Sequence, residues 1–300
     1  MKKVLVIGAA RSGVAACHLL KKMGYDVTVT DAKEIEEKKE LENMGIQVYE
    51  KEHPDILKDI SWEFIVKNPG IPYHVPFVAY FKERNVRILN EIEISTWVAK
   101  NLRFGAVTGT NGKTTTTTLL GALLKRKDAN AFCAGNIGVA LSEIVEKNPS
   151  LSTDVALEIA GFQLMGCETF HPLVSVCMNL TPDHVDYFKS VDAYYKSKML
   201  IYKNQTKEDT FLRNIDDENV LKYAQDIPCK VIDFSVYKDA DLCVKGDRVM
   251  LYDQCLFELK DFHLPGRHNV QNAMVAACMS YLMGVSLNDI QEGIREFKGV

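Results

Sequence analysis

The hydrophobic positions of the chain fall into short, continuous runs that alternate with amphipathic stretches. Residues 4–7 are apolar throughout, and residues 12–23 repeat apolar side chains at helical spacing. Further strand-like segments at residues 27–30, where Val alternates with Thr, and at residues 64–66 continue the alternation. Continuous apolar strands that alternate with helices are typical of a parallel sheet. We therefore predict a parallel-sheet α/β domain over residues 1–93.

A second alternating unit follows the polar stretch at residues 91–101, which we take as the joint between two domains. It starts with the apolar run 104–107, and later runs at residues 155–159 and 174–179 predict further strands of a parallel sheet. We assign residues 94–298 to this central domain.

The segment between residues 229 and 262 has a different pattern. Three short strand-like segments lie within it: residues 231–234, 248–252 and 255–259. They are split by Gly246-Asp247 and Asp253-Gln254, which are turn-forming pairs. We predict an antiparallel hairpin region here, followed by helices over residues 269–283 and 286–296.

Composition limits the classes of protein that the chain can represent. A net charge of −4 gives no reason to expect a nucleic acid as partner, and no apolar run reaches the length of a membrane span. The eight cysteines are scattered without a Cys-x-x-Cys pair, which favours reduced, buried thiols. We therefore expect a cytoplasmic protein with no nucleic-acid or membrane partner. We also expect a monomer.

A glycine loop lies between the apolar run at 104–107 and a helix-like stretch at 116–125. In this position a glycine loop cradles a nucleotide triphosphate, because backbone amides and the helix N-terminus attract phosphate. Lys113 would reach the terminal phosphates and the Thr114 hydroxyl would hold Mg²⁺. The predicted ATP-binding residues of the loop are Gly109, Thr110, Asn111, Gly112, Lys113, Thr114 and Thr115.

This loop departs from the general pattern at one position, because Val107 stands where that pattern has a glycine. The alternative interpretation is a glycine turn with an exposed lysine. With the loop interpreted as an ATP site, the predicted fold class is α/β. An N-terminal Rossmann-like parallel-sheet domain precedes a central P-loop-type ATP-binding α/β domain that carries the antiparallel hairpin region.

A second glycine turn, Gly8-Ala9-Ala10-Arg11-Ser12-Gly13, lies between the first strand and its helix. Dinucleotide-binding folds place a glycine where this chain has Ala10, and an acidic residue near the position of Asp31. We interpret the turn as a nucleotide or phosphate binder. A tight turn without a ligand is one alternative, and a nicotinamide-dependent oxidoreductase is another, although the ATP-type loop argues against hydride transfer.

These motifs occur together and in order in the Mur ligase family, which the whole chain resembles. The further matching motifs are Asn68-Pro69-Gly70-Ile71-Pro72, Gly135-Asn136-Ile137-Gly138, Leu157-Glu158, Phe162-Gln163-Leu164, Asp183-His184, Lys196-Ser197-Lys198 and residues 264–272. Within the family, the chain looks most like the member that adds D-glutamate to UDP-N-acetylmuramoyl-L-alanine.

The resemblance implies an ATP-dependent amide ligase of peptidoglycan precursor synthesis that works through an acyl phosphate. It implies UDP-N-acetylmuramoyl-L-alanine and D-glutamate as substrates, with ATP and Mg²⁺ as cofactors. The family has three domains, so we expect a chain truncated after residue 300, without the C-terminal amino-acid-binding domain and inactive alone. A folylpolyglutamate synthase-like ligase and a non-catalytic nucleotide-binding fragment stay open as alternatives.

The resemblance also implies roles for individual residues. The implied catalytic residues are Lys113, Glu158, His184 and Lys198, and the implied metal ligands are Thr114, Glu158, His184 and Lys198. Further contacts to ATP are implied for His268, Asn269 and Asn272, with helix capping as the alternative for Asn269. Substrate contacts are implied for Ser12, Gly13, Asp31, Asn68, Gly70 and Asn136.

Lys198 is implied to react with CO₂ and to ligate metal as a carbamate. That reaction needs a neutral amine, and burial or nearby cations would have to lower the pKa of Lys198. The alternative is a solvated lysine on a helix over residues 191–202.

One departure from the family concerns the two residues before Phe162, which are usually a pair of serines. Ala160 and Gly161 fill these positions here, which puts substrate contacts in doubt but not the reaction class.

We expect Tyr194 and Tyr195, which lie near Lys198 in the sequence, to serve as packing residues.

Overall fold

The computed structural model describes residues 1–300, except for the side chain of Val185. Packing divides the chain into two compact units, each described by itself below. Unit 1 comprises Met1–Asn101, Val139–Leu151 and Met165–Phe170, and unit 2 comprises Leu102–Gly138, Ser152–Leu164 and His171–Val300. Two later segments of the chain therefore pack within the N-terminal unit, and no hydrophobic pattern indicated this.

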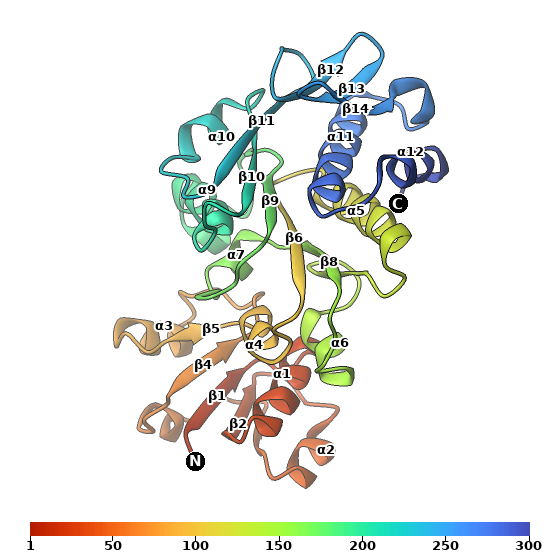
Figure 1. Cartoon of the computed structure of the whole chain (residues 1–300). Coiled ribbons are helices and arrows are strands. Elements are labelled where there is room, and N and C mark those ends of the chain that lie inside the picture. Colours follow the sequence, from red (N-terminus) through yellow and green to blue (C-terminus); the bar gives the residue numbers. More distant parts are fainter. The chain divides into compact units, whose positions relative to one another are not determined.

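Unit 1 is built on a parallel sheet with the strand order β3-β2-β1-β4-β5 (Figure 1, red to orange). Its strands are β1 (Lys3–Ile7), β2 (Asp26–Asp31), β3 (Gln47–Glu50), β4 (Phe64–Lys67) and β5 (Ile88–Leu89). The central strand β1 is buried from Val4 to Ile7, which is why this run is apolar without alternation. The predicted parallel sheet is confirmed.

Several helices surround this sheet. They are α1 (Arg11–Lys22), α2 (Lys38–Asn43), the 3₁₀ turn η1 (Asp55–Lys58), α3 (Pro76–Glu83), α4 (Glu91–Val98) and the returning α6 (Leu141–Lys147). Helix α1 packs against both α4 and α6. Most of the polar stretch that we took as a joint is therefore the helix α4, which belongs to the packed body of unit 1.

Two buried carboxylates of α4 hold the returning segments. Glu91 accepts a hydrogen bond of 2.8 Å from the amide of Ser142 in α6, and burial raises the pKa of Glu91 to about 7. The Glu93 carboxylate, fully buried, accepts the backbone amides of residues 168–170 at 2.9–3.1 Å. Burying a carboxylate is unfavourable unless donors surround it, and backbone amides serve as those donors here.

Unit 2 contains a mixed sheet with the order β14-β13-β12-β11-β10-β9-β6-β8-β7. Its strands are β6 (Arg103–Thr108), β7 (Phe132–Gly135), β8 (Asp154–Glu158), β9 (Val174–Cys177), β10 (Thr210–Asn214), β11 (Lys230–Ser235), β12 (Leu242–Lys245), β13 (Arg248–Leu251) and β14 (Gln254–Glu258). Pairing is parallel from β7 to β12 and antiparallel over β12-β13-β14.

The predicted hairpin region needs one correction. The run at 231–234 lies in β11, which pairs in parallel with β10 and is not part of the hairpin. β13 pairs with β14, as predicted, and also with β12, which the turn at Gly246-Asp247 joins to it. The prediction missed β12 because its apolar run is short and ends in Lys245.

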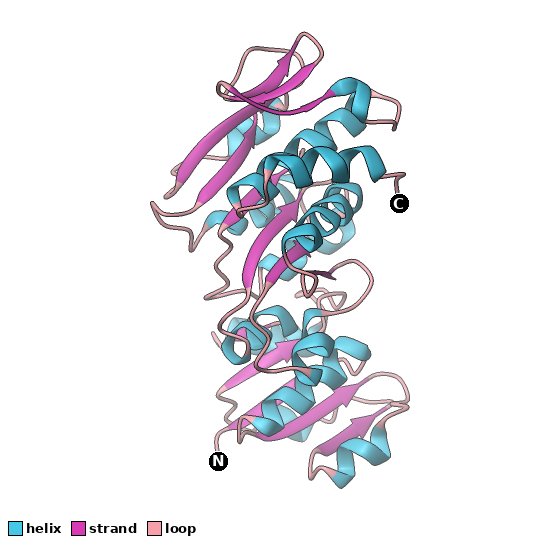
Figure 2. Ribbon diagram, turned by 45° about the vertical axis from the view of Figure 1, so that its right-hand side comes forward, coloured by secondary structure: helices cyan, strands magenta, loops and turns pink.

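The helices of unit 2 form two groups, one around α5, which starts at the glycine loop, and one around α9. They are α5 (Lys113–Lys127), α7 (Gly161–Leu164), α8 (Val185–Phe188), α9 (Val191–Met199), α10 (Glu218–Tyr223), α11 (Arg267–Leu282) and α12 (Leu287–Glu296), with 3₁₀ turns η2 (Leu200–Tyr202) and η3 (Leu259–Asp261). Helix α5 lies beside α11 and contacts α12 (Figures 1 and 2). The large core of unit 2 includes apolar side chains from α5, α11 and the strands.

Two expectations from composition concern the thiols and the membrane. All eight cysteines are free thiols, and Cys17, Cys177, Cys243 and Cys278 are buried. Among the described helices we find none that combines the length and the apolar composition of a membrane span.

We predict that Glu93→Ala lowers the free energy of unfolding by more than about 3 kcal/mol, because several buried backbone amides would lose their acceptor. Urea unfolding of the chain would measure this. The control is Glu168→Ala, which removes an exposed ion pair with Arg87 but leaves the backbone amide of residue 168 in place, and should change stability by less than about 1 kcal/mol. Equal effects of the two substitutions would contradict the anchoring role of Glu93.

Candidate functional site

The loop after β6 takes a backbone conformation that depends on glycine. Gly109 has φ of 141° and Gly112 has φ of 80°, both in a region that side chains disfavour. A Cβ atom at Gly112 would lie 2.5 Å from Asn272 Oδ1 of α11. The loop therefore packs closely against the start of α11, and Asn272 lies at the loop as predicted from the sequence.

Helix α5 begins directly after this loop and presents its N-terminus there. In the described structure Gly112 is the N-cap, without a side chain that bonds to the first amides of this 15-residue helix. Uncapped amides at a helix N-terminus suit a phosphate group. Lys113 Nζ donates to the carbonyl of Thr110 at 2.9 Å, and partial burial lowers the pKa of Lys113. These features fit a nucleotide triphosphate.

Residues from the neighbouring strand ends fix the loop conformation. The side chain of Asn179 bonds to both backbone groups of Asn111, accepting from its amide at 2.8 Å and donating to its carbonyl at 3.0 Å. The Thr110 hydroxyl donates to the carbonyl of Thr181 at 3.1 Å and lies 3.3 Å from the Tyr194 hydroxyl. Sequence reasoning missed Asn179, although a polar residue directly after a buried strand was the available signal.

Glu158, at the end of β8, brings two other predicted residues together. Its carboxylate is 2% exposed and accepts hydrogen bonds from Thr114 Oγ1 at 2.8 Å and from Asn136 Nδ2 at 2.9 Å. A hydroxyl and a carboxylate are oxygen donors of the kind that Mg²⁺ prefers. The phosphates that such an ion also needs would come from a nucleotide bound at the adjacent loop and helix N-terminus.

Lys198 reaches the same loop from α9. It is 2% exposed, its Nζ donates to the carbonyl of Gly109 at 2.7 Å, and it lies 4.6 Å from the centre of the Tyr194 ring. Burial lowers the pKa of Lys198 to about 8. The alternative of a solvated helix lysine is therefore wrong. The expectation that Tyr194 only packs is incomplete, because its hydroxyl and its ring both face this cluster.

His184 lies near this cluster without a direct bond to it. Its side chain is 53% exposed, its φ is 48°, and its ring centre lies 5.9 Å from that of Tyr194 and 6.1 Å from that of Phe162. Over the described residues, no group of three or more His, Cys, Asp or Glu side chains forms a metal site of its own. A bound Mg²⁺ would therefore need phosphate, hydroxyl or water oxygens as well.

The start of α11 differs from the prediction in its capping. Gly266, with φ of 94°, is the N-cap, and Asn269 Nδ2 instead donates to the carbonyl of Pro265 at 2.7 Å. Capping by Asn269 is therefore wrong. The exposed His268 lies over Gly266, where an added Cβ would approach its ring to 2.7 Å.

The predicted substrate residues of unit 1 gather at the carboxyl end of β1. Asp31 accepts the amide of Ala9 at 2.6 Å and so closes the glycine turn. A Cβ at Gly13 would lie 2.0 Å from the carbonyl oxygen of Gly8, which is why α1 needs a glycine there. Ser12 is half-buried in the first turn of α1.

The loop after β4 lies against this turn. Asn68 Cβ would be 2.6 Å from a Cβ at Gly8, and Asn68 Oδ1 accepts the amide of Gly70 at 3.0 Å. Lys67, 2% exposed, donates to the carbonyls of Asn68 at 3.0 Å and Ile71 at 2.6 Å. Burial lowers the pKa of Lys67 to about 7. Sequence reasoning missed Lys67, since a lysine that ends a short strand usually faces water.

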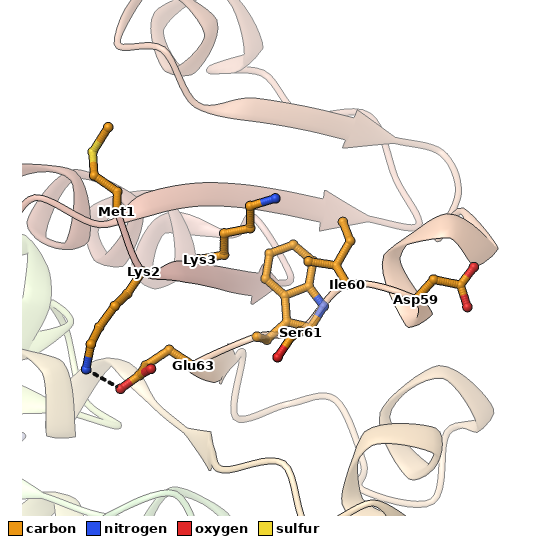
Figure 3. Close-up of a pocket in the computed structure, with 8 residues that line it drawn as sticks. Met1, Lys2, Lys3, Asp59, Ile60, Ser61 and Glu63 are labelled. Atoms are coloured by element: carbon orange, nitrogen blue, oxygen red, sulfur yellow. Dashed lines mark hydrogen bonds and ion pairs between the residues drawn. The ribbon is translucent and has the colours of Figure 1, made fainter.

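Two hollows in the surface lie elsewhere. One of about 580 Å³ is lined by Met1–Lys3 and by residues 59–63, at the amino ends of β1 and β4 (Figure 3). The other, of about 560 Å³, includes Val174, Thr210 and Ile232, on β9, β10 and β11. None of the predicted site residues lines either hollow. Ligands of parallel sheets bind at the carboxyl ends of the strands, whereas these hollows lie away from the predicted site residues.

Comparison with known proteins identifies the family. Residues 107–280 match the model of the Mur ligase middle domain. The chain is also 38% identical, over 304 residues, to the UDP-N-acetylmuramoylalanine–D-glutamate ligases of Streptococcus mutans and of a Geobacillus species. The chain belongs to the Mur ligase family. The match covers the whole chain and 67% of each relative, so the chain spans about two thirds of their length.

A solved structure supports the fold. The UDP-N-acetylmuramate:L-alanyl-gamma-D-glutamyl-meso-diaminopimelate ligase from Neisseria meningitides superposes with a TM-score of 0.65 at 21% identity, covering 100% of this chain and 99% of that one. The family match and the two D-glutamate ligases support an ATP-dependent ligase of peptidoglycan precursors, which uses ATP with Mg²⁺ as the Mur ligase family generally does. They do not favour a folylpolyglutamate synthase.

We predict that Lys113→Ala weakens ATP binding in the presence of Mg²⁺ by about tenfold or more, because a charge-assisted hydrogen bond contributes roughly 1.5–3 kcal/mol. Isothermal titration calorimetry with a non-hydrolysable ATP analogue measures the change. The matched control is Lys125→Ala, an exposed lysine in the last turn of the same helix, which should bind as the unchanged chain does. Unaltered affinity in Lys113→Ala would refute the assignment of the loop.

Proposed function

We propose that this chain provides the UDP-substrate site and the ATP site of a ligase that joins D-glutamate to UDP-N-acetylmuramoyl-L-alanine. The observation that carries the proposal is the cluster in unit 2, where Thr114, Glu158 and Lys198 converge on the loop and on the start of α5. The relatives that share 38% of the sequence are named for this reaction. The occurrence of a second nucleotide-type turn in unit 1 supports a second ligand.

The chemistry of phosphoryl transfer explains why the cluster contains positively charged side chains and few catalytic acids or bases. A carboxylate is a poor electrophile, so its oxygen first takes the γ-phosphoryl group of ATP, with ADP leaving. The amine of D-glutamate then attacks the carbonyl carbon, the amide forms and phosphate leaves. Phosphoryl transfer depends mainly on positioned positive charge. Lys113 and the N-terminus of α5 would hold the phosphates, while Glu158 would orient Thr114.

Unit 1 would bind the UDP-linked substrate. Its glycine turn, with Ser12 and Gly13 at the start of α1, would receive the diphosphate, since a helix N-terminus attracts phosphate. Asp31 would contact the uridine side, and Asn68 with Gly70 would shape the same site. We also propose that the protein works in the cytoplasm and as a monomer, with free thiols as support for the compartment.

We predict that the two ligands can be lost separately. Gly13→Ala forces a Cβ onto the Gly8 carbonyl, so it should weaken UDP-N-acetylmuramoyl-L-alanine binding by about tenfold or more and spare ATP. Lys113→Ala should do the reverse, so each variant is the control for the other in calorimetry. NADH binding tighter than that of the UDP-linked substrate would instead favour an oxidoreductase.

The proposal includes a carbamate on Lys198. Burial of Lys198 favours the neutral amine, whose nitrogen attacks CO₂, and the nitrogen proton passes to solvent as the N–C bond forms. The carbamate would add two oxygens to a site where Glu158 is the carboxylate bonded to Thr114. The hydrogen bond to Gly109 opposes the neutral form to some degree, because a carbonyl prefers an ammonium donor.

We predict that ¹³C NMR of the chain in labelled bicarbonate shows one lysine carbamate, whose signal grows as the pH rises through about 8, where the neutral amine of Lys198 becomes the main form. Lys198→Ala and Lys198→Arg should remove the signal, since a guanidinium stays charged. Lys196→Ala is the control, because Lys196 is exposed on the same helix and pairs with Asp192. A signal that persists in Lys198→Ala would disprove the carbamate at this position.

A further inference from the structure

Helices α7 and α9 meet at a point where no side chain fits between them. A Cβ atom at Gly161, the first residue of α7, would lie 2.2 Å from Ser197 Oγ and 3.3 Å from Ser197 Cβ. It would also lie 3.5 Å from Lys198 Cγ. Distances near 2 Å are far inside van der Waals contact, so any larger residue at position 161 has to displace α9 or turn the Ser197 side chain.

Ser197 is not free to turn. Its side chain is buried, at 4% exposure, and its hydroxyl donates to the carbonyl of Tyr194 at 2.7 Å. Rotation would break this bond and leave a buried hydroxyl in need of another partner, which is unfavourable. The hydroxyl therefore remains in the space that a side chain at position 161 would need.

Helix α7 is also fixed at its start. The amide of Ala160 donates to Gln163 Oε1 at 2.9 Å, and the amide of Ile159 donates to the carbonyl of Val107 in β6 at 3.0 Å. Since the chain before Gly161 is tied to the sheet, a larger residue at 161 would push α9, and with it Lys198, rather than α7.

We infer that the absence of a side chain at Gly161 positions the amine of Lys198 at the carbonyl of Gly109. Gly161 acts through Lys198 and is a positioning residue, whereas the Ser197 hydroxyl occupies the space that a side chain at position 161 would need. The inference rests on the proposed function, in which Lys198 takes part in the ATP site. It also accounts for the glycine at position 161, where the family usually has a serine. A serine there would collide with the Ser197 hydroxyl, so the two hydroxyls exclude each other.

The test compares Gly161→Ala, Ser197→Ala and the double variant. Gly161→Ala should reduce carbamate formation at fixed pH by roughly tenfold or more, because displacement of a positioned group by about 1 Å has effects of this size. Ser197→Ala alone should stay within about twofold of the unchanged chain. The double variant should recover to within about twofold, since removal of the hydroxyl makes room for the new methyl group.

A second substitution tests the same contact from the other helix. Ser197→Thr keeps the hydroxyl but adds a methyl group, so it should reproduce the loss seen in Gly161→Ala. It also tests the contact if Gly161→Ala does not fold.

Thermal unfolding of all variants separates misplacement of Lys198 from general destabilisation. Recovery of carbamate formation in the double variant at an unchanged unfolding temperature supports the inference. Normal carbamate formation in both Gly161→Ala and Ser197→Thr, or no recovery in a folded double variant, would overturn it.

The position of the Lys198 side chain itself keeps this test separate from the carbamate proposal. Lys198 Nζ lies 4.6 Å from the centre of the Tyr194 ring, so the ring current of Tyr194 shifts the NMR signals of the Lys198 ε-methylene group. If the unchanged chain forms no carbamate, that proposal fails, but the signals of ε-¹³C-labelled lysine still report the position of the amine. Gly161→Ala should then move the ε-methylene signal of Lys198 towards that of a free lysine, and the double variant should restore it. Identical signals in the unchanged chain and in folded Gly161→Ala would count against the positioning role.

Discussion

The bond between Lys198 and the carbonyl of Gly109 ties helix α9 to the glycine loop of the proposed ATP site. A buried ammonium is unfavourable unless its environment compensates for the lost water. Here a carbonyl at 2.7 Å and the face of Tyr194 provide that compensation. The carbonyl is available because Gly109 takes a φ of 141°, which other residues avoid. The conformation of the loop and the burial of the lysine therefore depend on each other.

In unit 1, too, a buried lysine donates hydrogen bonds to the carbonyl groups of a loop. Lys67 ends β4 and turns inward, where the carbonyls of residues 68 and 71 receive its amine. A lysine that bonds to carbonyl groups inside a loop fixes that loop without using its amide groups. Amides are the groups that attract phosphate, so an internal lysine is compatible with an anion-binding loop. Each unit thus contains a buried lysine next to a glycine-containing loop at the carboxyl end of its sheet.

Short-range features were predictable from the sequence, whereas contacts across the fold were not. The apolar run of β1 and the Lys113-Thr114 loop could be predicted because burial on both faces and glycine geometry leave local patterns. The polar stretch at residues 91–101 was predicted to be a joint because Glu91 and Glu93 look solvated in the sequence. In the structure, backbone amides that are distant in sequence bind both carboxylates. Likewise, the collision between positions 161 and 197 has no local signal, because it arises only where α7 and α9 meet.

Glu91 and Glu93 also mean that unit 1 is not one continuous stretch of the chain. Its fold includes α6 and residues 165–170, which follow the glycine loop of unit 2 in the sequence. A fragment that ends near residue 101 would keep both carboxylates but lose the backbone amides that donate hydrogen bonds to them. Unit 1 is thus complete only once the chain up to residue 170 has been made, so synthesis on the ribosome passes through strands β6, β7 and β8 before the first unit can close.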